Sequence, residues 1–114
     1  MNRFDIVVFA RPDSEPDTGI EDYIKRVIAL PGETVEGRDG HVVVDDQVLE
    51  EPYLDEGTTT SDFEPRLVPA GEVFVMGDNR SVSIDSRVFG AIPESTIVGR
   101  AFVRIWPLTH LGFL

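Results

Sequence analysis

The sequence has 114 residues, of which 41% are hydrophobic and none is cysteine, and its formal net charge is −11 at pH 7. A chain of this length forms one domain that can bury a core without disulfides, and the missing thiols exclude a thiolate zinc site and a cysteine nucleophile. Sixteen of the 21 acidic residues lie between Asp13 and Glu64, against three basic residues there. Because this charge repels a nucleic-acid backbone, we expect no nucleic-acid partner and interpret the acidic stretch as a solvated face.

Six short segments rich in β-branched and apolar residues predict β-strands. Proline and glycine mark the connections, since Arg11-Pro12 ends the first strand and Pro31-Gly32 ends the second, beyond which residues 34–36 can extend. Asp45-Asp46 predicts a tight polar turn between the third and fourth strands, which then form a hairpin. In chain order, the predicted strands are residues 5–10, 23–30, 41–44, 47–49, 72–76 and 97–106.

The remaining segments predict connections between these strands. Residues 50–65 are turn-rich and acidic, residues 77–90 form a polar loop, and Pro93-Glu94-Ser95 predicts a single helical turn. No long segment has helical periodicity, and no run of about eighteen apolar residues is available to span a bilayer. The sequence therefore predicts one all-β domain over residues 1–114, folded as a compact, partly closed antiparallel β-barrel.

Lys25 is the only lysine in the chain, and it lies inside the apolar segment 23–30. Strand alternation places Lys25 and Arg26 on opposite faces, so one of them points toward the layer against which the strand packs. Two interpretations stay open on this pattern. Lys25 lies either on an exposed face, where its stem covers apolar surface, or in the interior, where its amine can serve chemistry.

The polar segment 77–87 reads Gly-Asp-Asn-Arg-Ser-Val-Ser-Ile-Asp-Ser-Arg. Its two Asp, two Arg, three Ser and one Asn can form many charge-assisted hydrogen bonds, either in a functional loop or in a capped surface loop that serves only stability. A metal site would need more carboxylates or a nearby histidine, and His41 and His110 have no acidic or serine neighbours at a telling spacing. We therefore expect no metal and no cofactor.

Taken in order, these segments resemble type I signal peptidases. Residues 22–33, Asp-Tyr-Ile-Lys-Arg-Val-Ile-Ala-Leu-Pro-Gly-Glu, resemble the lysine-bearing box of that family, and residues 77–87 match its GDNR-x-x-S-x-D-S-R box at every fixed position. Residues 4–9 resemble the strand box that precedes the lysine strand, and residues 99–108 fit the family's ending. The resemblance spans nearly the whole chain, and the eleven-residue box is a specific signal.

The resemblance implies a serine endopeptidase that removes signal peptides from secreted preproteins at the outer face of the cell membrane. Its chemistry is acyl transfer by a serine whose base is a lysine, and Lys25 is that base by position. A lysine acts as a base only when its amine is neutral, and burial in an apolar strand lowers its pKa. The supporting residues by position are Ser83, which orients the amine, the ion pairs Arg26–Asp78 and Asp85–Arg87, and Gly77, which keeps the loop backbone close to the lysine.

The family's nucleophile lies upstream of the first strand, in a Ser-Met-x-Pro-type box that follows one or more membrane helices. No segment of this sequence matches that box, and Ser14 is flanked instead by Asp13 and Glu15-Pro16. The oxyanion donors of the family come mainly from the same missing region. We therefore expect an N-terminally truncated catalytic domain that is soluble and inactive by itself, whereas the full-length family form is associated with the membrane.

Two other functions stay open at this stage. One is a non-catalytic, signal-peptidase-like module that binds peptides or partners. The other is a related Ser/Lys processing enzyme, such as a self-cleaving repressor or a pilus-processing peptidase. Lys25 and the intact 77–87 loop favour the protease, because a degenerate module has no need of a base, and the GDNR box favours the signal peptidase branch.

Overall fold

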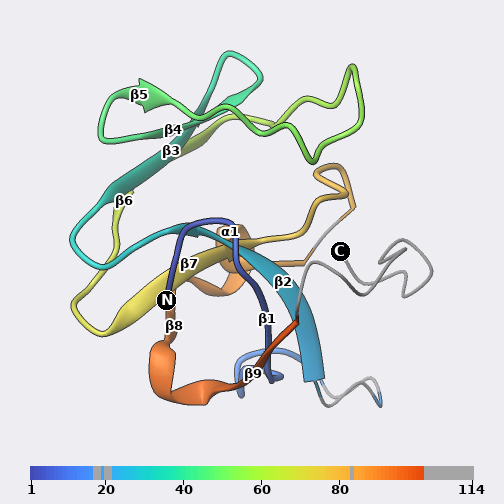
Figure 1. Cartoon of the computed structure of the whole chain (residues 1–114), viewed down its shortest axis with the longest axis vertical. Helices are drawn as coiled ribbons and strands as arrows, with labels where there is room; N and C mark the ends of the chain where they lie inside the picture. The colour runs from blue at the N-terminus through green and yellow to red at the C-terminus, as the bar shows by residue number, and fades with distance from the viewer. Residues whose placement is uncertain (17–18, 20–21, 83, 102–114) are drawn as a thin grey trace.

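The chain folds into two antiparallel β-sheets that lie one above the other in Figure 1. The structure is a computed structural model, and it describes residues 1–16, 19, 22–82 and 84–101. The larger sheet has the strand order β8-β7-β2-β1-β9, and the smaller has the order β5-β4-β3-β6. The elements are β1 (Ile6–Ala10), β2 (Asp22–Ala29), β3 (Thr34–Arg38), β4 (His41–Val44), β5 (Gln47–Val48), β6 (Phe63–Leu67), β7 (Glu72–Met76), α1 (Ser86–Phe89), β8 (Ile92–Pro93), the 3₁₀ turn η1 (Glu94–Thr96) and β9 (Ile97–Ala101).

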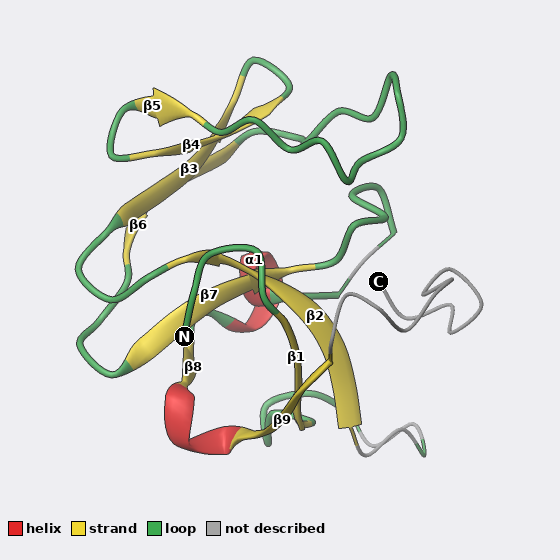
Figure 2. Cartoon of the chain, in the orientation of Figure 1, coloured by secondary structure: helices red, strands yellow, loops and turns green. Residues whose placement is uncertain are grey.

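The larger sheet is built around β2, which pairs with β1 on one side and β7 on the other. Its register places Lys25 opposite Val7 and Arg26 opposite both Ile6 and Met76. Figure 2 shows that β2 bends strongly, so the sheet curls toward a half-barrel. The prediction of a mostly β, partly closed antiparallel fold is confirmed.

The smaller sheet is a pair of tight hairpins with β6 added at its edge. The turn residues Asp39-Gly40 and Asp45-Asp46 all have positive φ. Two-residue turns of this kind match the twist of paired strands, which is why Asp and Gly are favoured there. The hairpin predicted around Asp45-Asp46 is confirmed as β4–β5.

The structure corrects the sequence-based prediction at two connections. The turn-rich segment 50–65 continues into the strand β6, although that strand contains Pro65. Proline is compatible with β6 because this strand lies at the edge of its sheet, where the backbone groups on the outer side need no hydrogen bond to another strand. The polar loop 77–90 ends in the short helix α1, whose first turn is capped by Asp85.

Two other predictions concern the end of the chain. The helical turn predicted at residues 93–95 is confirmed as the 3₁₀ turn η1. The last predicted strand, 97–106, is confirmed as β9 up to Ala101, and residues 102–106 lie outside the described residues.

The core consists of two clusters that cover opposite faces of the larger sheet. Ile28, Phe74 and Met76 point toward the smaller sheet, where they meet Val35 and Val42. The second cluster, on the other face, is Val7, Phe9, Val27, Val73, Val75 and Ile92. Because β2 contributes side chains to both clusters, its residues from Lys25 to Ala29 are buried, and a polar side chain in this part of the strand is removed from water.

Gly37 in β3 pairs with Phe63 of β6 in the smaller sheet, and a β-carbon on it would come within 2.6 Å of both Phe63 Cδ1 and the Ser61 carbonyl oxygen. Gly37→Ala should therefore lower the free energy of unfolding by about 1–3 kcal/mol, because β6 must move away. Gly99→Ala is the matched control, since a β-carbon at Gly99 meets nothing within 4 Å. Urea denaturation should show the control unchanged or up to about 1 kcal/mol more stable, and equal effects of the two substitutions would contradict this packing argument.

Candidate active site

Lys25 lies in the middle of β2, and only 8% of its surface is exposed. On the neighbouring strand β1 it pairs with the apolar Val7, and its Nζ atom lies 6.0 Å from the centre of the Tyr23 ring. Burial lowers the pKa of Lys25, and Arg87 lowers it further, whereas the charges of Asp85 and Asp78 act in the opposite direction. Desolvation is the largest of these effects, so the site favours the neutral amine, which is the form that can accept a proton.

Gly77 follows directly after β7. Because Met76 pairs with Arg26 in antiparallel register, Gly77 lies level with the residue that precedes Arg26, which is Lys25. Its N–H donates to Asp85 Oδ2 at 2.9 Å, and its carbonyl accepts from Arg80 Nε at 2.9 Å. Both backbone groups of Gly77 are therefore held by side chains of the following loop. That Gly77 is required for close approach to the lysine stays a prediction.

Arg26, the other basic residue of β2, projects from the opposite face of the strand. It donates from Nε and Nη2 to the two carboxylate oxygens of Asp78, at 3.0 and 2.8 Å. Its Nη1 donates to the carbonyl of Phe4 at 3.2 Å. Phe4 adopts a positive φ of 72°, an unusual conformation for this residue type, which directs that carbonyl toward the guanidinium. The ion pair expected between Arg26 and Asp78 is thus present and bidentate.

Asp85 is completely buried, and its carboxylate is satisfied by four donors. Besides the Gly77 N–H, these are the backbone N–H of Arg87 at 3.0 Å and the Nε and Nη2 atoms of the same residue at 2.9 and 2.7 Å. The remaining guanidinium nitrogen of Arg87 donates to the Arg80 carbonyl at 2.9 Å. The expected ion pair between Asp85 and Arg87 is therefore present, and it also begins α1.

Ser86 is the next residue of the same loop, and it is fully buried. Its hydroxyl oxygen accepts a hydrogen bond from the Val75 N–H at 2.8 Å, which fastens α1 to β7. Arg66 of β6 donates to the carbonyls of Ser86 and Arg87. The hydroxyl of Ser86 is thus used in tertiary structure. Ser83, predicted to orient the lysine amine, lies outside the described residues.

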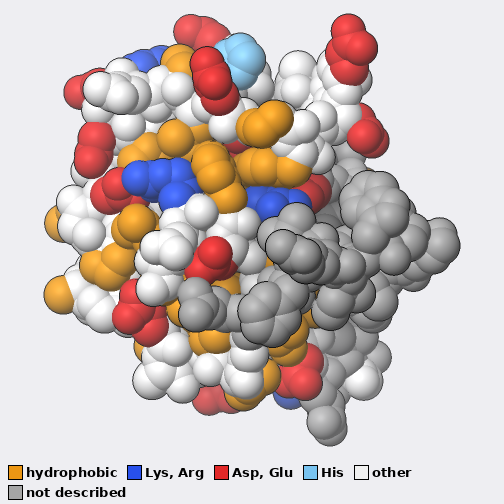
Figure 3. Space-filling model, in the orientation of Figure 1, with side chains coloured by type: hydrophobic (Ala, Val, Ile, Leu, Met, Phe, Trp, Pro, Cys, Tyr) orange, Lys and Arg blue, Asp and Glu red, His pale blue; other side chains and the backbone are white. Residues whose placement is uncertain are grey.

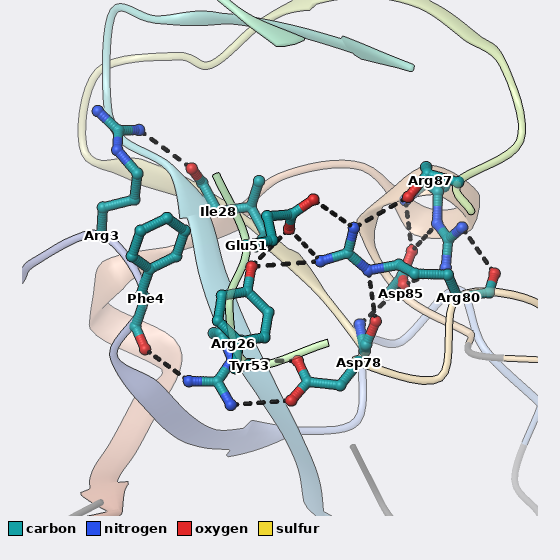
Figure 4. Close-up of polar contacts among 12 residues, drawn as sticks. Arg3, Phe4, Arg26, Ile28, Glu51, Tyr53, Asp78, Arg80, Asp85 and Arg87 are labelled. Atoms are coloured by element: carbon teal, nitrogen blue, oxygen red, sulfur yellow. Dashed lines mark hydrogen bonds and ion pairs between the residues drawn. The ribbon is translucent and has the colours of Figure 1, made fainter. Parts of the chain in front are cut away.

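Three residues near this loop were missed by sequence reasoning. Arg80, with 3% of its surface exposed, donates to both carboxylate oxygens of Glu51 and to the Thr60 hydroxyl. Tyr53 donates its hydroxyl to Glu51, and its ring lies 3.9 Å from Arg26 Cζ (Figure 4). Arg80 was visible within the GDNR segment as a second arginine without an assigned partner. Glu51 and Tyr53 come from the acidic connection after β5, where no periodicity indicates burial.

Basic and acidic side chains occupy different parts of the surface around these residues. On the face drawn in Figure 3, the larger basic patches lie between the two sheets beside hydrophobic side chains, while acidic side chains are scattered over the rest. Among the described residues, no group of three or more His, Asp and Glu side chains could hold a metal ion. The same part of the chain contains no helix that is long and apolar enough to cross a membrane.

Known proteins match nearly the whole chain. The family profile described as "Signal peptidase, peptidase S26" matches residues 1–106. The chain is 44% identical to signal peptidase I of Leptolyngbya laminosa, over 98% of this chain and 56% of the relative, and 43% identical to thylakoidal processing peptidase 1 of Arabidopsis thaliana, over 90% and 32%. A crystal structure of a signal peptidase I from Enterococcus faecalis superposes with a TM-score of 0.75 at 34% identity, covering 90% of this chain and 97% of that one.

The buried pair Asp85–Arg87 should contribute to stability because removal of one partner leaves the other charge unpaired. Arg87→Ala should lower the free energy of unfolding by about 1–3 kcal/mol, as measured by urea denaturation. Arg38→Ala serves as the control, since the Arg38 side chain is 49% exposed in its pair with Glu36, and it should cost less than about 1 kcal/mol. A denaturation midpoint of Arg87→Ala equal to that of the parent would refute the role of this pair.

The lowered pKa of Lys25 should make stability depend on pH. The pKa of this residue in the unfolded chain is near the ordinary value of 10.5, so the unfolded state binds more protons than the folded state between the two pKa values. Stability should therefore rise with pH across that window and be lowest below it. Lys25→Met should gain most stability at pH values below the lowered pKa of Lys25, and the gain should shrink as the pH approaches 10.5. A difference between the two proteins that stays constant with pH would mean that the amine is hydrated.

Proposed function

The chain belongs to the peptidase S26 family of signal peptidases, whose members cleave signal peptides, and we propose that it performs this cleavage with Lys25 as the general base of a Ser/Lys dyad. The observation that carries the proposal is the burial of the only lysine of the chain in the centre of β2. A lysine on a hydrated face would stay protonated near neutral pH and could not accept a proton.

The proposed reaction is acyl transfer in two steps. The neutral amine of Lys25 takes the proton of a serine hydroxyl while the serine oxygen attacks the scissile carbonyl carbon. When the tetrahedral intermediate collapses, the new ammonium returns this proton to the leaving amine of the mature protein. A water molecule, activated by the same lysine, then hydrolyses the acyl-enzyme and releases the signal peptide with a free carboxylate.

The ion pairs beside Lys25 support the base role through their effect on charge. Asp78 and Asp85 would favour the ammonium if their charges were uncompensated. Each is instead paired with an arginine, Asp78 with Arg26 and Asp85 with Arg87. We assign Ser83 the role of orienting the amine and Gly77 that of bringing the loop backbone next to it.

The nucleophile is proposed to come from residues that are not among these 114. No Ser-Met-x-Pro-type box occurs in the sequence, and the hydroxyl of the buried Ser86 is engaged with the Val75 N–H. The chain spans about half the length of the curated relatives it matches. Following the family resemblance, we place the serine upstream of β1, together with the membrane anchor and the oxyanion donors.

The proposed substrates are preprotein signal peptides, and the proposed location is the outer face of the cell membrane, where the anchored form meets translocated preproteins. No cofactor is required by this chemistry, because the serine and the lysine supply both the nucleophile and the base.

Cleavage of a signal-peptide substrate tests the proposal. The 114-residue chain alone should not cleave, because a base without a nucleophile has nothing to activate. A longer form, extended before Met1 by a segment that carries the serine box, should cleave. In that form Lys25→Ala and substitution of the box serine by alanine should each abolish turnover, as measured by mass spectrometry of the products.

Two outcomes would overturn parts of this assignment. Turnover by the 114-residue chain that disappears on Lys25→Ala would place the nucleophile within these residues. An extended form that binds the signal peptide but never cleaves it would favour the alternative function, a non-catalytic signal-peptidase-like binding module.

A further inference from the structure

Arg26 and Arg80 are linked by a closed chain of contacts that runs between the two sheets. Arg80 binds Glu51 through both carboxylate oxygens, and Glu51 accepts the hydroxyl of Tyr53. The ring of Tyr53 covers the Arg26 guanidinium at 3.9 Å. Figure 4 shows these side chains converging from β2, from the connection after β5 and from the loop after β7.

The chain of contacts closes on the loop backbone. Arg26 holds the carboxylate of Asp78, and Arg80 holds the carbonyl of the preceding residue, Gly77. These two consecutive loop residues are therefore fixed from both sides by the same network. The network is buried: the side chain of Arg80 has no exposed surface, and that of Glu51 is 8% exposed.

Tyr53 is the part of this network that shields Arg26 from water. One face of the guanidinium is covered by the Tyr53 ring, and its edge is occupied by Asp78 and by the carbonyl of Phe4. The rings of Tyr53 and Phe4 also pack together, with centroids 5.3 Å apart. A stacked aromatic ring excludes water from an ion pair and strengthens it, because the local dielectric constant falls.

The strength of the Arg26–Asp78 pair matters to Lys25. Among the described residues, the charged groups that act on its amine are Asp78, Asp85 and Arg87, while the facing residue of β1 is the uncharged Val7. Asp85 is buried beside its own arginine. The side chain of Asp78 is 21% exposed, so its compensation depends on how firmly Arg26 is held.

We propose that Tyr53 and Glu51 are positioning residues for the chemistry of Lys25: Glu51 anchors the Tyr53 ring, and the ring holds Arg26 on Asp78 so that this carboxylate stays neutralised beside the amine. The inference rests on the proposed function of Lys25 as a base. It gives the connection between β5 and β6 a part in the reaction, although that connection belongs to the smaller sheet.

The test reads the pKa of Lys25 directly in the 114-residue chain, where NMR titration of ¹³C-labelled lysine reports one site because the chain has one lysine. Tyr53→Leu should shift this pKa upward, since Arg26 becomes hydrated and the charge of Asp78 is less compensated. Phe63→Leu is the matched control. It also removes a ring that stacks in the core, against Phe74, and that approaches an arginine, Arg66, but it should leave the pKa of Lys25 unchanged.

A double-mutant cycle isolates the route through Asp78. In an Asp78→Asn background, Tyr53→Leu should no longer shift the pKa of Lys25, because no charge is left to be exposed. A shift that persists in this background would mean that water entry alone carries the effect, and the route through the ion pair would be wrong.

Kinetics of the serine-containing longer form provide the second measurement. Tyr53→Leu should lower kcat/KM near neutral pH, and activity should recover at higher pH, where Lys25 loses its proton. A purely structural defect would lower kcat/KM at every pH. If the longer form is inactive both as the parent and as Tyr53→Leu, the proposed function fails, while the NMR titration still decides the positioning role.

The proposal is overturned if Tyr53→Leu leaves the pKa of Lys25 unchanged, or if Phe63→Leu shifts it equally. Where Tyr53→Leu does not fold, Tyr53→Phe decides, because it keeps the ring over Arg26 and removes only the hydroxyl donated to Glu51. It should give a smaller shift in the same direction, and no shift would overturn the anchoring role of Glu51.

Discussion

The buried carboxylate of Asp85 organises the loop that follows β7. A carboxylate without solvent access must receive hydrogen bonds on both oxygens, and Asp85 receives them from Gly77 and from Arg87. Meeting this requirement fixes the start of the loop against β7 and its end at the first turn of α1. The two ends of the segment beside Lys25 are therefore held together by the hydrogen bonds of one side chain.

The second sheet contributes to the site from a distance in sequence. Arg80 crosses from the loop to Glu51, and Arg66 of β6 binds the carbonyls at the start of α1. Hydrogen bonds to charged groups are stronger than those between neutral groups, and both arginines are removed from bulk water on at least part of their surface. The two sheets thus meet through an apolar cluster and through hydrogen bonds of guanidinium groups. The hydrogen bonds of Arg80 and Arg66 connect the smaller sheet to the loop and the helix α1 of the candidate site.

The sequence predicted the elements whose signals are local. The strands β1, β2, β4 and β7 follow from β-branched runs bounded by proline or glycine. The resemblance of residues 22–33 and 77–87 to the signal peptidase boxes implied the two ion pairs that the structure contains. The strand β6 was missed because Pro65 argues against a strand unless its edge position is known. Glu51 and Tyr53 were missed because their burial results from contacts with a loop almost thirty residues away, which no local pattern reports.

Charge balance explains why the surroundings of Lys25 favour its neutral amine. The residues around the loop include three carboxylates, those of Glu51, Asp78 and Asp85, and three guanidinium groups, those of Arg26, Arg80 and Arg87, joined in pairs. Because paired charges largely cancel at a distance, the cluster exerts little net field on a neighbouring amine. Desolvation is then left as the dominant influence, and it acts against the ammonium. An unpaired carboxylate beside Lys25 would favour the ammonium, so the proposed base role depends on these ion pairs as well as on the apolar strand in which the lysine lies.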